Sequence, residues 1–440
     1  MNSTLKSMLI AAAAITSVSA FAQDKATLDL LVKKGIITAE ERAKTLQSAA
    51  ATKTESGMDR VFIKEAGANR LTFAGRIQGQ WEMIDYSQTT GAGVKTDAID
   101  LNNFLMRRIY LGAKVDVGMG FSGELVYNFA DNSQGTAGVR AGAFDKTVFT
   151  YESELGKIDI GYQKVNFGQE ENTSSSALYT VERSMVTRYW AESHNGRRLG
   201  FGARHVGAFY SNKVVIGEGG PGTLVYGAAI VDAVQGYNST GVNDYGYYGN
   251  VSFDWKPLGT TVGFNYGITP EGGTLSNVGG DIDMVEGLNP YIKYVTGDFT
   301  ILGEYIVTAV DASSTTATAQ GFLARDPSGY NLTLAYKVSE NIELVARYSA
   351  LDTDGRGQKA TDGFRDTVTT GTADSTYDKS DSLFVGVNYY FNKNNAKVQL
   401  GYEKAKLEDR ISSYASGVPV IAAGDKAEAD IFRVQAQILF

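Results

Sequence analysis

The sequence predicts an all-β protein, a 16-stranded antiparallel transmembrane β-barrel preceded by a short helical module. Three observations support this class. The chain starts with an export signal, most of its length alternates apolar and polar residues, and the 440 residues include 50 Gly and 25 Tyr but no Cys. Exported chains of alternating strands with many aromatic residues are typical of outer-membrane barrels.

Residues 1–22 have the pattern of a signal peptide. A single Lys6 precedes the apolar run from Met8 to Ile15, and the small-residue site Ala20-Phe21-Ala22 predicts cleavage before Gln23. The run is too short for a membrane helix, which needs about 20 apolar residues. We therefore expect export to the envelope of a Gram-negative bacterium, with the outer membrane as destination.

The charge and the reactive residues exclude several classes of protein. Lys and Arg number 41 against 49 Asp and Glu, a formal charge of −8, and loss of Lys6 leaves 40 against 49, or −9. Nucleic acids require clustered basic surface, so no nucleic-acid partner is expected. With no Cys and only His194 and His205, we expect no enzyme, no metal site and no cofactor.

The mature N-terminus, residues 23–56, is predicted to be a periplasmic helical or coiled-coil module. A first helix ends at Lys34-Gly35, and the T-x-x-E pattern from Thr38 to Glu41 is a capping box for a second helix. A partly disordered leader is the alternative. Residues 57–69 are a predicted linker, and residues 70–440 are the predicted barrel.

From Arg70 the hydrophobic period is two. In RLTFAGRIQGQWEM, Leu71, Phe73 and Ile77 lie on one face and Arg76 lies on the other. A soluble sandwich or propeller would show less Arg and Lys at mid-strand on the polar face. The predicted strands are 70–83, 107–117, 120–129, 147–155, 157–165, 198–210, 222–233, 246–256, 259–268, 288–296, 298–309, 328–338, 341–351, 380–391, 396–406 and 429–440.

The connections alternate in length. Short turns are expected on the periplasmic side, at 117–120, 156–157, 257–259, 297–298, 339–340 and 392–395. Long polar connections are expected on the outer side, at 87–103, 131–145, 269–286, 310–327, 352–379 and 407–428. The last strand ends on Phe440, which resembles the signal that barrel-assembly machinery recognises.

Two patterns suggest other functions but are set aside. Residues 118–123 match G-x-G-x-x-G, the dinucleotide fingerprint, but they lie at a hairpin turn with no following helix. The acidic stretch 352–381 suggests Ca²⁺ binding but lacks the EF-hand spacing, so a solvated outer loop is expected there. His205 is predicted to lie on an apolar strand face, at an interface.

One stretch does not alternate: residues 163–189, QKVNFGQEENTSSSALYTVERSMVTRY. It begins a segment that resembles the phosphate-selective porin O and P family. The resemblance is carried by four motifs: FLMRRIYLGAKV (104–115), KVNFGQEENTSSSALYTVERS (164–184), ENIELVARYSALD (340–352) and VNYYFNKNNAKVQLGYE (387–403). Asn166 departs from the family, which usually has Pro there.

The resemblance implies a homotrimeric 16-stranded porin in which a long loop, here residues 166–197, folds inward and constricts the channel. The loop would be held against the wall by Glu170, Glu171, Thr173, Ser174, Ser175 and Glu182. The candidate anion path comprises Arg76, Arg108, Lys114, Lys164, Arg183, Arg188, Arg204, Arg347 and Arg433. An ordinary structural pairing with nearby acids is the alternative for each cation.

We therefore expect passive diffusion of small hydrophilic solutes, with phosphate-like anions as the leading class and outer-membrane lipid around the barrel. A general or cation-preferring porin is the first alternative, since the chain is acidic overall. A structural envelope anchor, tethered through the N-terminal module, is the second.

Overall fold

The computed structural model describes residues 32–35, 38, 61–66, 69–133, 141–191, 198–217, 219–233, 244–270, 282–312, 324–364, 375–415 and 418–440. The chain divides into two units, residues 1–59 and 60–440. The predicted signal peptide and nearly all of the predicted helical module lie outside the described residues. Gly35 has φ of +69° and donates to the Val32 carbonyl, as expected where a helix ends.

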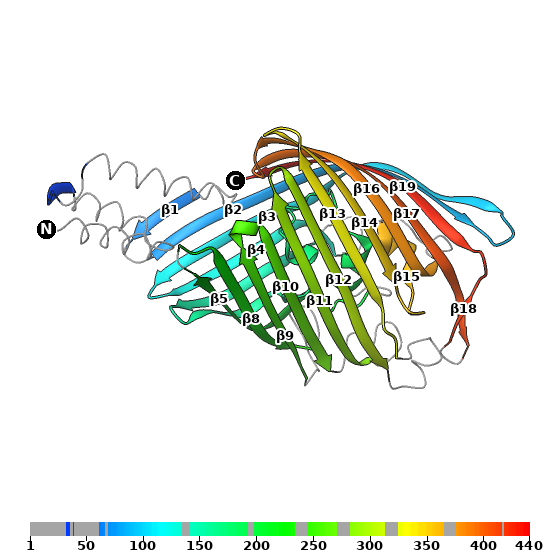
Figure 1. The fold of residues 1–440 in the computed structure, drawn as a ribbon, viewed down its shortest axis with the longest axis horizontal. Helices are drawn as coiled ribbons and strands as arrows, with labels where there is room; N and C mark the ends of the chain where they lie inside the picture. Colours follow the sequence, from blue (N-terminus) through cyan, green and yellow to red (C-terminus); the bar gives the residue numbers. More distant parts are fainter. Residues whose placement is uncertain are drawn as a thin grey trace. The chain divides into compact units, whose positions relative to one another are not determined.

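The second unit is a closed antiparallel barrel of 16 strands (Figure 1), which confirms the predicted fold class. The wall strands are β2 (Asn69–Thr89), β3 (Lys95–Gly118), β4 (Phe121–Ser133), β5 (Ala141–Ser153), β6 (Gly156–Lys164), β7 (Arg204–Ile216), β8 (Gly222–Asp232), β9 (Tyr245–Trp255), β10 (Thr260–Pro270), β11 (Ile282–Thr296), β12 (Phe299–Ala312), β13 (Ser328–Lys337), β14 (Ile342–Asp352), β16 (Thr376–Asn392), β17 (Ala396–Ala415) and β19 (Lys426–Leu439). Among the described residues, no helix is long and apolar enough to cross a membrane.

The barrel closes where β19 pairs with β2. Beyond this ladder, the Phe440 backbone N–H and C=O bond to Gly75 at 3.1 and 2.7 Å. The Phe440 ring lies over Gly75, where a Cβ atom would come within 2.3 Å of it. Only glycine therefore accommodates the terminal aromatic ring in this position.

Three short strands supplement the wall: β1 (Val61–Ala66), β15 (Gln358–Lys359) and β18 (Val418–Ile421). The strand β1 pairs with residues 69–73, the part of β2 that extends past the end of β19. It thereby satisfies backbone groups that would otherwise be an open sheet edge. The range 57–69, predicted as a linker, thus contains a strand.

Alternation along each strand separates a lipid-type face from a polar interior. In β13, Leu332 and Leu334 are each 44% exposed outward, whereas Asn331 and Thr333 are 5% and 8% exposed. Aromatic side chains pair outside near the short turns, as in Phe121–Tyr151 and Phe299–Tyr336, whose ring centroids are 4.7 and 4.4 Å apart. An apolar band bordered by aromatic residues is what a membrane barrel requires.

The long connections differ from the prediction. Most of the range 87–103 is strand, because β2 and β3 remain paired as far as Thr89 and Lys95. Likewise β17 continues to Ala415 within the range 407–428. Backbone hydrogen bonds extend these hairpins through stretches with several charged residues, such as KTD at 95–97 and EDR at 408–410.

His205 is placed differently from the prediction. The strand β7 starts at Arg204 rather than at residue 198, and His205 pairs with the inward-facing Gln163. The imidazole is 2% exposed, with its Nδ1 2.9 Å from the Asp232 carbonyl oxygen. His205 therefore belongs to the barrel interior. His194 lies outside the described residues.

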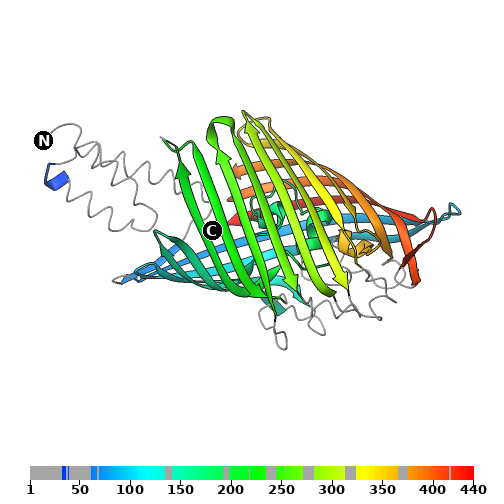
Figure 2. The ribbon, with the colours of Figure 1, turned by 60° about the horizontal axis from the view of Figure 1, so that its bottom comes forward.

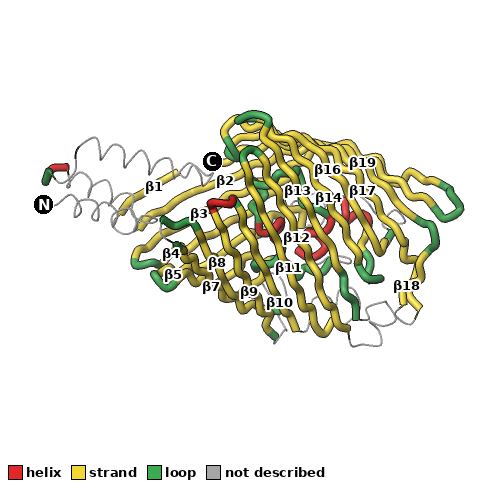
Figure 3. Tube along the Cα trace, in the orientation of Figure 1, coloured by secondary structure: helices red, strands yellow, loops and turns green. Residues whose placement is uncertain are grey.

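Two segments fill part of the interior. The lumen segment, the described residues 165–191 and 198–203 between β6 and β7, contains α4 (Gln169–Asn172) and α5 (Met185–Ala191). The second lumen segment, residues 353–364 between β14 and β16, contains β15 and α7 (Ala360–Phe364). Figures 2 and 3 show these helices within the ring of strands, and η1 (Lys256–Leu258) at a turn of the rim.

Apolar packing holds both segments in place. One buried cluster joins Phe167, Trp190 and Phe201 of the lumen segment to wall residues including Tyr248 and Ile306. Another buried cluster joins Met185, Ala360 and Phe364 to wall residues including Tyr86 and Leu407. Apolar side chains of the inward wall face are therefore buried under both segments, in addition to polar ones.

Candidate functional site

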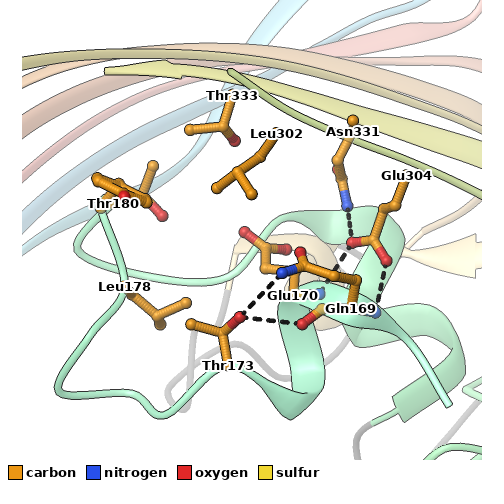
Figure 4. A pocket seen from close by; sticks show the side chains of 11 residues that line it. Gln169, Glu170, Thr173, Leu178, Thr180, Leu302, Glu304, Asn331 and Thr333 are labelled. Atoms are coloured by element: carbon orange, nitrogen blue, oxygen red, sulfur yellow. Dashed lines mark hydrogen bonds between the residues drawn. The ribbon is translucent and has the colours of Figure 1, made fainter. Parts of the chain in front are cut away.

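The helix α4 is anchored to the wall by a carboxylate of β12 (Figure 4). Glu304 accepts hydrogen bonds from the backbone N–H groups of Gln169 and Glu170, at 2.8 and 3.3 Å. The N-cap residue of α4 is Gly168, which makes no side-chain hydrogen bond to the first turn. Glu304 of the wall therefore supplies the acceptor for the free N–H groups of that turn. The amide of Asn331 also donates to Glu304, at 2.9 Å. An adjoining cavity of about 30 Å³ has room for roughly one water.

Glu170 and Arg347 form the central contact between the lumen segment and β14. The Arg347 Nη1 atom lies 2.9 Å from Glu170 Oε1 and 2.8 Å from the Glu182 carbonyl oxygen. Its Nη2 atom lies 3.2 Å from Glu403 Oε1. The Arg347 side chain is fully buried. It therefore ties the segment to the wall and does not face the passage.

The Glu182 carboxylate binds two adjacent arginines of β3. Arg107 donates through Nε at 2.5 Å and through Nη2 at 3.2 Å, and Arg108 Nη2 lies 3.7 Å away. A β-bulge opposite Gln78 and Gly79 leaves Arg107 without a register partner, so both arginines face inward. Strict alternation along β3 predicts that Arg108 faces inward and Arg107 does not. A signal for Arg107 was available, because one of two consecutive arginines would otherwise face lipid.

Glu171 is held between two cations. It forms ion pairs with the Lys164 ammonium and, at 3.0 Å, with Arg183 Nε. Arg183 Nη2 also donates to the carbonyl oxygens of Glu171 and Thr173, at 3.1 and 2.8 Å. Arg183 therefore caps the C-terminal carbonyls of α4, while Lys164 is the more exposed of the two cations.

The hydroxyl residues of the T-S-S motif have separate roles. The Ser175 hydroxyl accepts from Arg76 of β2, and the Ser175 carbonyl accepts from Gln78 at 3.3 Å. Thr173 and Ser174 bond within the segment, Thr173 to the Gln169 carbonyl and Ser174 to Ser176. Of these three predicted anchors, Ser175 is the one that these hydrogen bonds join to a wall strand.

Further anchors come from wall residues that the sequence did not single out. Lys397 donates to the Leu178 carbonyl at 3.0 Å, and Asn388 donates to the Tyr179 carbonyl at 2.9 Å. The Gln399 amide lies 3.2 Å from the Leu178 carbonyl. These amide and ammonium groups occupy inward positions of β16 and β17. The alternation of β16 and β17 in the sequence indicates that these side chains point inward. It does not indicate which carbonyl groups of the lumen segment they bind.

Arg188 and Arg433 hold the second lumen segment. Arg188 donates to the Gly363 carbonyl at 2.9 Å, and Arg433 donates to the Phe364 carbonyl at 2.5 Å. The Phe364 and Tyr86 rings pack with centroids 5.3 Å apart. The described residues 353–364 are thus not the solvated outer loop that the sequence predicts. Burying Phe364 inside the barrel is the physical reason.

Cations gather on the side of the lumen formed by β2 to β7. We call this group the basic cluster: Arg76, Arg107, Arg108, Lys164, Arg183 and Arg204. Three carboxylates accompany it, Asp145, Glu171 and Glu182. Six cations against three anions leave a formal excess of +3.

Part of the basic cluster is accessible. The side chains of Arg107, Lys164 and Arg204 are 17%, 21% and 26% exposed. Arg204 pairs with Asp145, whose carboxylate also accepts from Tyr110 at 3.0 Å. Arg76, half-buried, lies over the Tyr110 ring at 4.8 Å, while Lys114 is half-buried opposite Glu124 in the β3–β4 register.

Buried carboxylates lie on the opposite side of the lumen: Glu304, Glu343 and Glu403 on wall strands, and Glu170 on the lumen segment facing them. Each is at most 12% exposed. Asp145, beside Arg204, is 27% exposed, so the accessible charges of the basic cluster and its carboxylates are three cations against one anion. Within the described ranges, no group of three His, Cys, Asp or Glu side chains is placed to hold a metal ion.

Comparison with known proteins agrees with this architecture. A family model described as phosphate-selective porin O and P matches residues 76–438. A search of curated proteins gives no significant match.

Solved structures show the same fold at low identity. The outer membrane channel DcaP of Acinetobacter baumannii is 14% identical with a TM-score of 0.56, covering 86% of this chain and 99% of its own. An anion-selective porin from Comamonas acidovorans is 14% identical with a TM-score of 0.52, covering 84% and 100%. A trimer form of the outer membrane protein OmpT of Vibrio cholerae is 14% identical with a TM-score of 0.50, covering 85% and 100%.

Proposed function

The chain belongs to the phosphate-selective porin O and P family, and from this premise we propose that its barrel passes small phosphate-like anions passively across the outer membrane. The outer-membrane channel is the function of the family. The selectivity, the trimeric assembly, the export signal and the role of Phe440 in assembly are parts of the proposal.

The basic cluster is the observation that supports anion passage. An anion loses hydration on entering a narrow channel, and guanidinium and ammonium groups replace that hydration with charge-assisted hydrogen bonds. Arg107, Lys164 and Arg204 are accessible for this role, with a formal excess of +3 behind them. Arg347 and Arg188 are instead committed to holding the two lumen segments.

The lumen segment would set the constriction. It reaches β2, β3, β12, β14 and β17 through ion pairs or hydrogen bonds. A segment tied to so many strands supports a fixed narrowing of the barrel. The trimer form of the OmpT structure supports a homotrimer as the assembly.

A cation-preferring porin remains the second candidate, because carboxylates face the lumen from β12 to β17 and the chain is acidic overall. Their low exposure argues against it. Carboxylates and cations are both ion-paired or hydrogen-bonded, but the carboxylates are at most 12% exposed, whereas the three cations are 17–26% exposed.

The deciding experiment is the zero-current potential of the purified protein in a planar bilayer under a KCl gradient, followed by phosphate titration. We expect chloride selectivity and block by phosphate. Arg204→Gln should weaken both. Lys404→Gln, which removes a cation 42% exposed on the outer face, is the matched control and should change neither.

A potassium-selective potential without phosphate block would overturn the anion proposal. The family would then account for the fold alone.

A further inference from the structure

A polar cavity lies against the inner wall of β6 to β9, beside the start of the lumen segment. Its volume is about 190 Å³. Its lining includes the charged and amide side chains of Lys157, Asp159, Gln163, Lys164, Asn166 and Asn250. We call it the β6–β9 pocket. It shares Lys164 with the basic cluster, but its other lining residues lie outside that cluster.

The pocket has one more cation than anion. Lys157 and Lys164 line it, and Asp159 is its one lining carboxylate among the described residues. Asp159 accepts from Lys157 at 2.7 Å and from Gln163 at 3.3 Å. The Lys164 ammonium is paired with Glu171. The Lys157 side chain is 35% exposed, so its remaining protons face the open space and favour an anionic group.

An amide pair provides both a donor and an acceptor. Asn166 Nδ2 donates to Asn250 Oδ1 at 2.9 Å. The groups that this bond leaves are the Asn250 NH₂ and the Asn166 carbonyl, which match the donor and acceptor character of an alcohol. Gly227 makes room for this pair, because a Cβ there would come within 2.8 Å of Asn250 Oδ1.

Size limits the solute. A volume of 190 Å³ equals the share of about six water molecules. A phosphate ion alone would leave much of this volume filled by water. It would also leave the amide pair without a solute partner. A three-carbon chain with hydroxyls and one anionic group uses the volume, the cations and the amides together. The buried Phe209 and Tyr248 rings also line the pocket and suit the carbon chain.

We propose that the β6–β9 pocket is a second solute subsite, which takes a small polyol bearing one phosphate or carboxylate group. The anionic group binds Lys157 and Lys164. The hydroxyls bind the Asn166–Asn250 pair and Asp159. This inference rests on the proposed channel function and extends its substrate class from inorganic anions to small hydroxylated organic anions.

The test compares two blockers of equal charge and similar size. Glycerol 3-phosphate carries hydroxyls and n-propyl phosphate does not. We expect glycerol 3-phosphate to block the chloride current at a concentration about tenfold lower than n-propyl phosphate does. The reason is that its hydroxyls add two neutral hydrogen bonds, each of which raises the affinity roughly fivefold or less. Glycerate against butyrate shows whether a carboxylate serves as well as a phosphate.

Asn250→Ala should reduce the ratio of the two block constants to about twofold, with the n-propyl phosphate constant unchanged. Asn166→Ala is the second variant, should the first fail to give the folded barrel on gels. Asp254→Asn is the matched control. Asp254 also faces the lumen from β9 and bonds a threonine, at 2.9 Å from Thr261 Oγ1, but it does not line the pocket.

Equal block by both phosphates in the native protein would overturn the subsite, as would an unchanged ratio in Asn250→Ala or Asn166→Ala. Phosphate block with anion selectivity would in those cases leave the channel proposal standing. A potassium-selective channel that none of the anions blocks would overturn both.

Discussion

Replacing Arg347 by Met should release the lumen segment from β14 without opening the barrel wall. The guanidinium joins the Glu170 and Glu403 carboxylates, at 2.9 and 3.2 Å, to the Thr180 hydroxyl and the Glu182 carbonyl, at 3.0 and 2.8 Å. Methionine keeps the length and apolar stem of the side chain but leaves both carboxylates without this partner.

The magnitude follows from burial. The Arg347 side chain is 0% exposed, and the side chains of Glu170 and Glu403 are 12% and 9% exposed. Removing one partner of a buried ion pair costs about 3–5 kcal/mol. The lower end, about 3 kcal/mol, applies because lumen water can reach a displaced segment. That corresponds to a roughly hundredfold larger population of the released state.

Trp190 makes the release measurable. It is fully buried, and its Nε1 atom donates to Thr308 Oγ1 at 2.9 Å. With Trp81 and Trp255 replaced by Phe, its fluorescence reports the lumen segment alone. Acrylamide quenching through a urea titration in detergent should show exposure of Trp190 at lower urea in Arg347→Met, before the wall strands unfold.

Lys404→Met is the control, since Lys404 is 42% exposed and its acidic partners lie at 3.8 and 3.9 Å. Such a surface pair contributes less than about 1 kcal/mol, so the Trp190 transition should not move. If Arg347→Met and the parent expose Trp190 at the same urea concentration, the segment is not held by this contact and the reasoning is refuted.

Three further predictions concern other parts of the barrel. Phe364→Ala should cost about 3–5 kcal/mol of local packing and raise single-channel conductance by freeing the second lumen segment; unchanged conductance would contradict its position. Gly75→Val should displace Phe440, whose ring lies 2.3 Å from a Cβ there, and lower the yield of heat-modifiable barrel during refolding, whereas Gly79→Val, with no ring nearby, should not. The hydrogen bond from the Gly91 N–H lowers the pKa of Asp425 below its ordinary 3.8. This contact therefore stabilises the outer turns fully above pH 3.8, and the stabilisation is lost as the pH falls through the lower pKa of the folded state. Hydrogen exchange at Gly91 should accelerate as the pH falls through that pKa, and Asp425→Asn should abolish this pH dependence.

Much of the barrel is local in origin and was predictable. A period of two over segments such as 328–338 indicates strands with an apolar and a polar face, and no partner has to be known to read it. The turns are also local, as where Gly118 and Gly120 adopt φ of +83° and +84°. The 16 predicted strands are all present, with boundaries shifted, as where β2 and β3 extend to Thr89 and Lys95 and where β7 begins at Arg204.

The candidate site was predictable only in part. Arg76, Lys164 and Arg204 were expected inside and do lie in the basic cluster. Arg107 was missed because a bulge shifts the alternation by one residue. The role of Arg347 also needed the structure, since its partners Glu170 and Glu403 are 177 and 56 residues away in sequence.

The sequence by itself determined the alternating strands and their aromatic end, because each depends on neighbouring residues and on the solvent that each face meets. Tertiary structure decided which ion-paired cations stay accessible, as Arg107, Lys164 and Arg204 do, and which are fully buried, as Arg347 is. It also decided that Phe364 turns into the barrel. These outcomes depend on closure of the ring, which brings distant side chains to within hydrogen-bond length, and no local pattern encodes that distance.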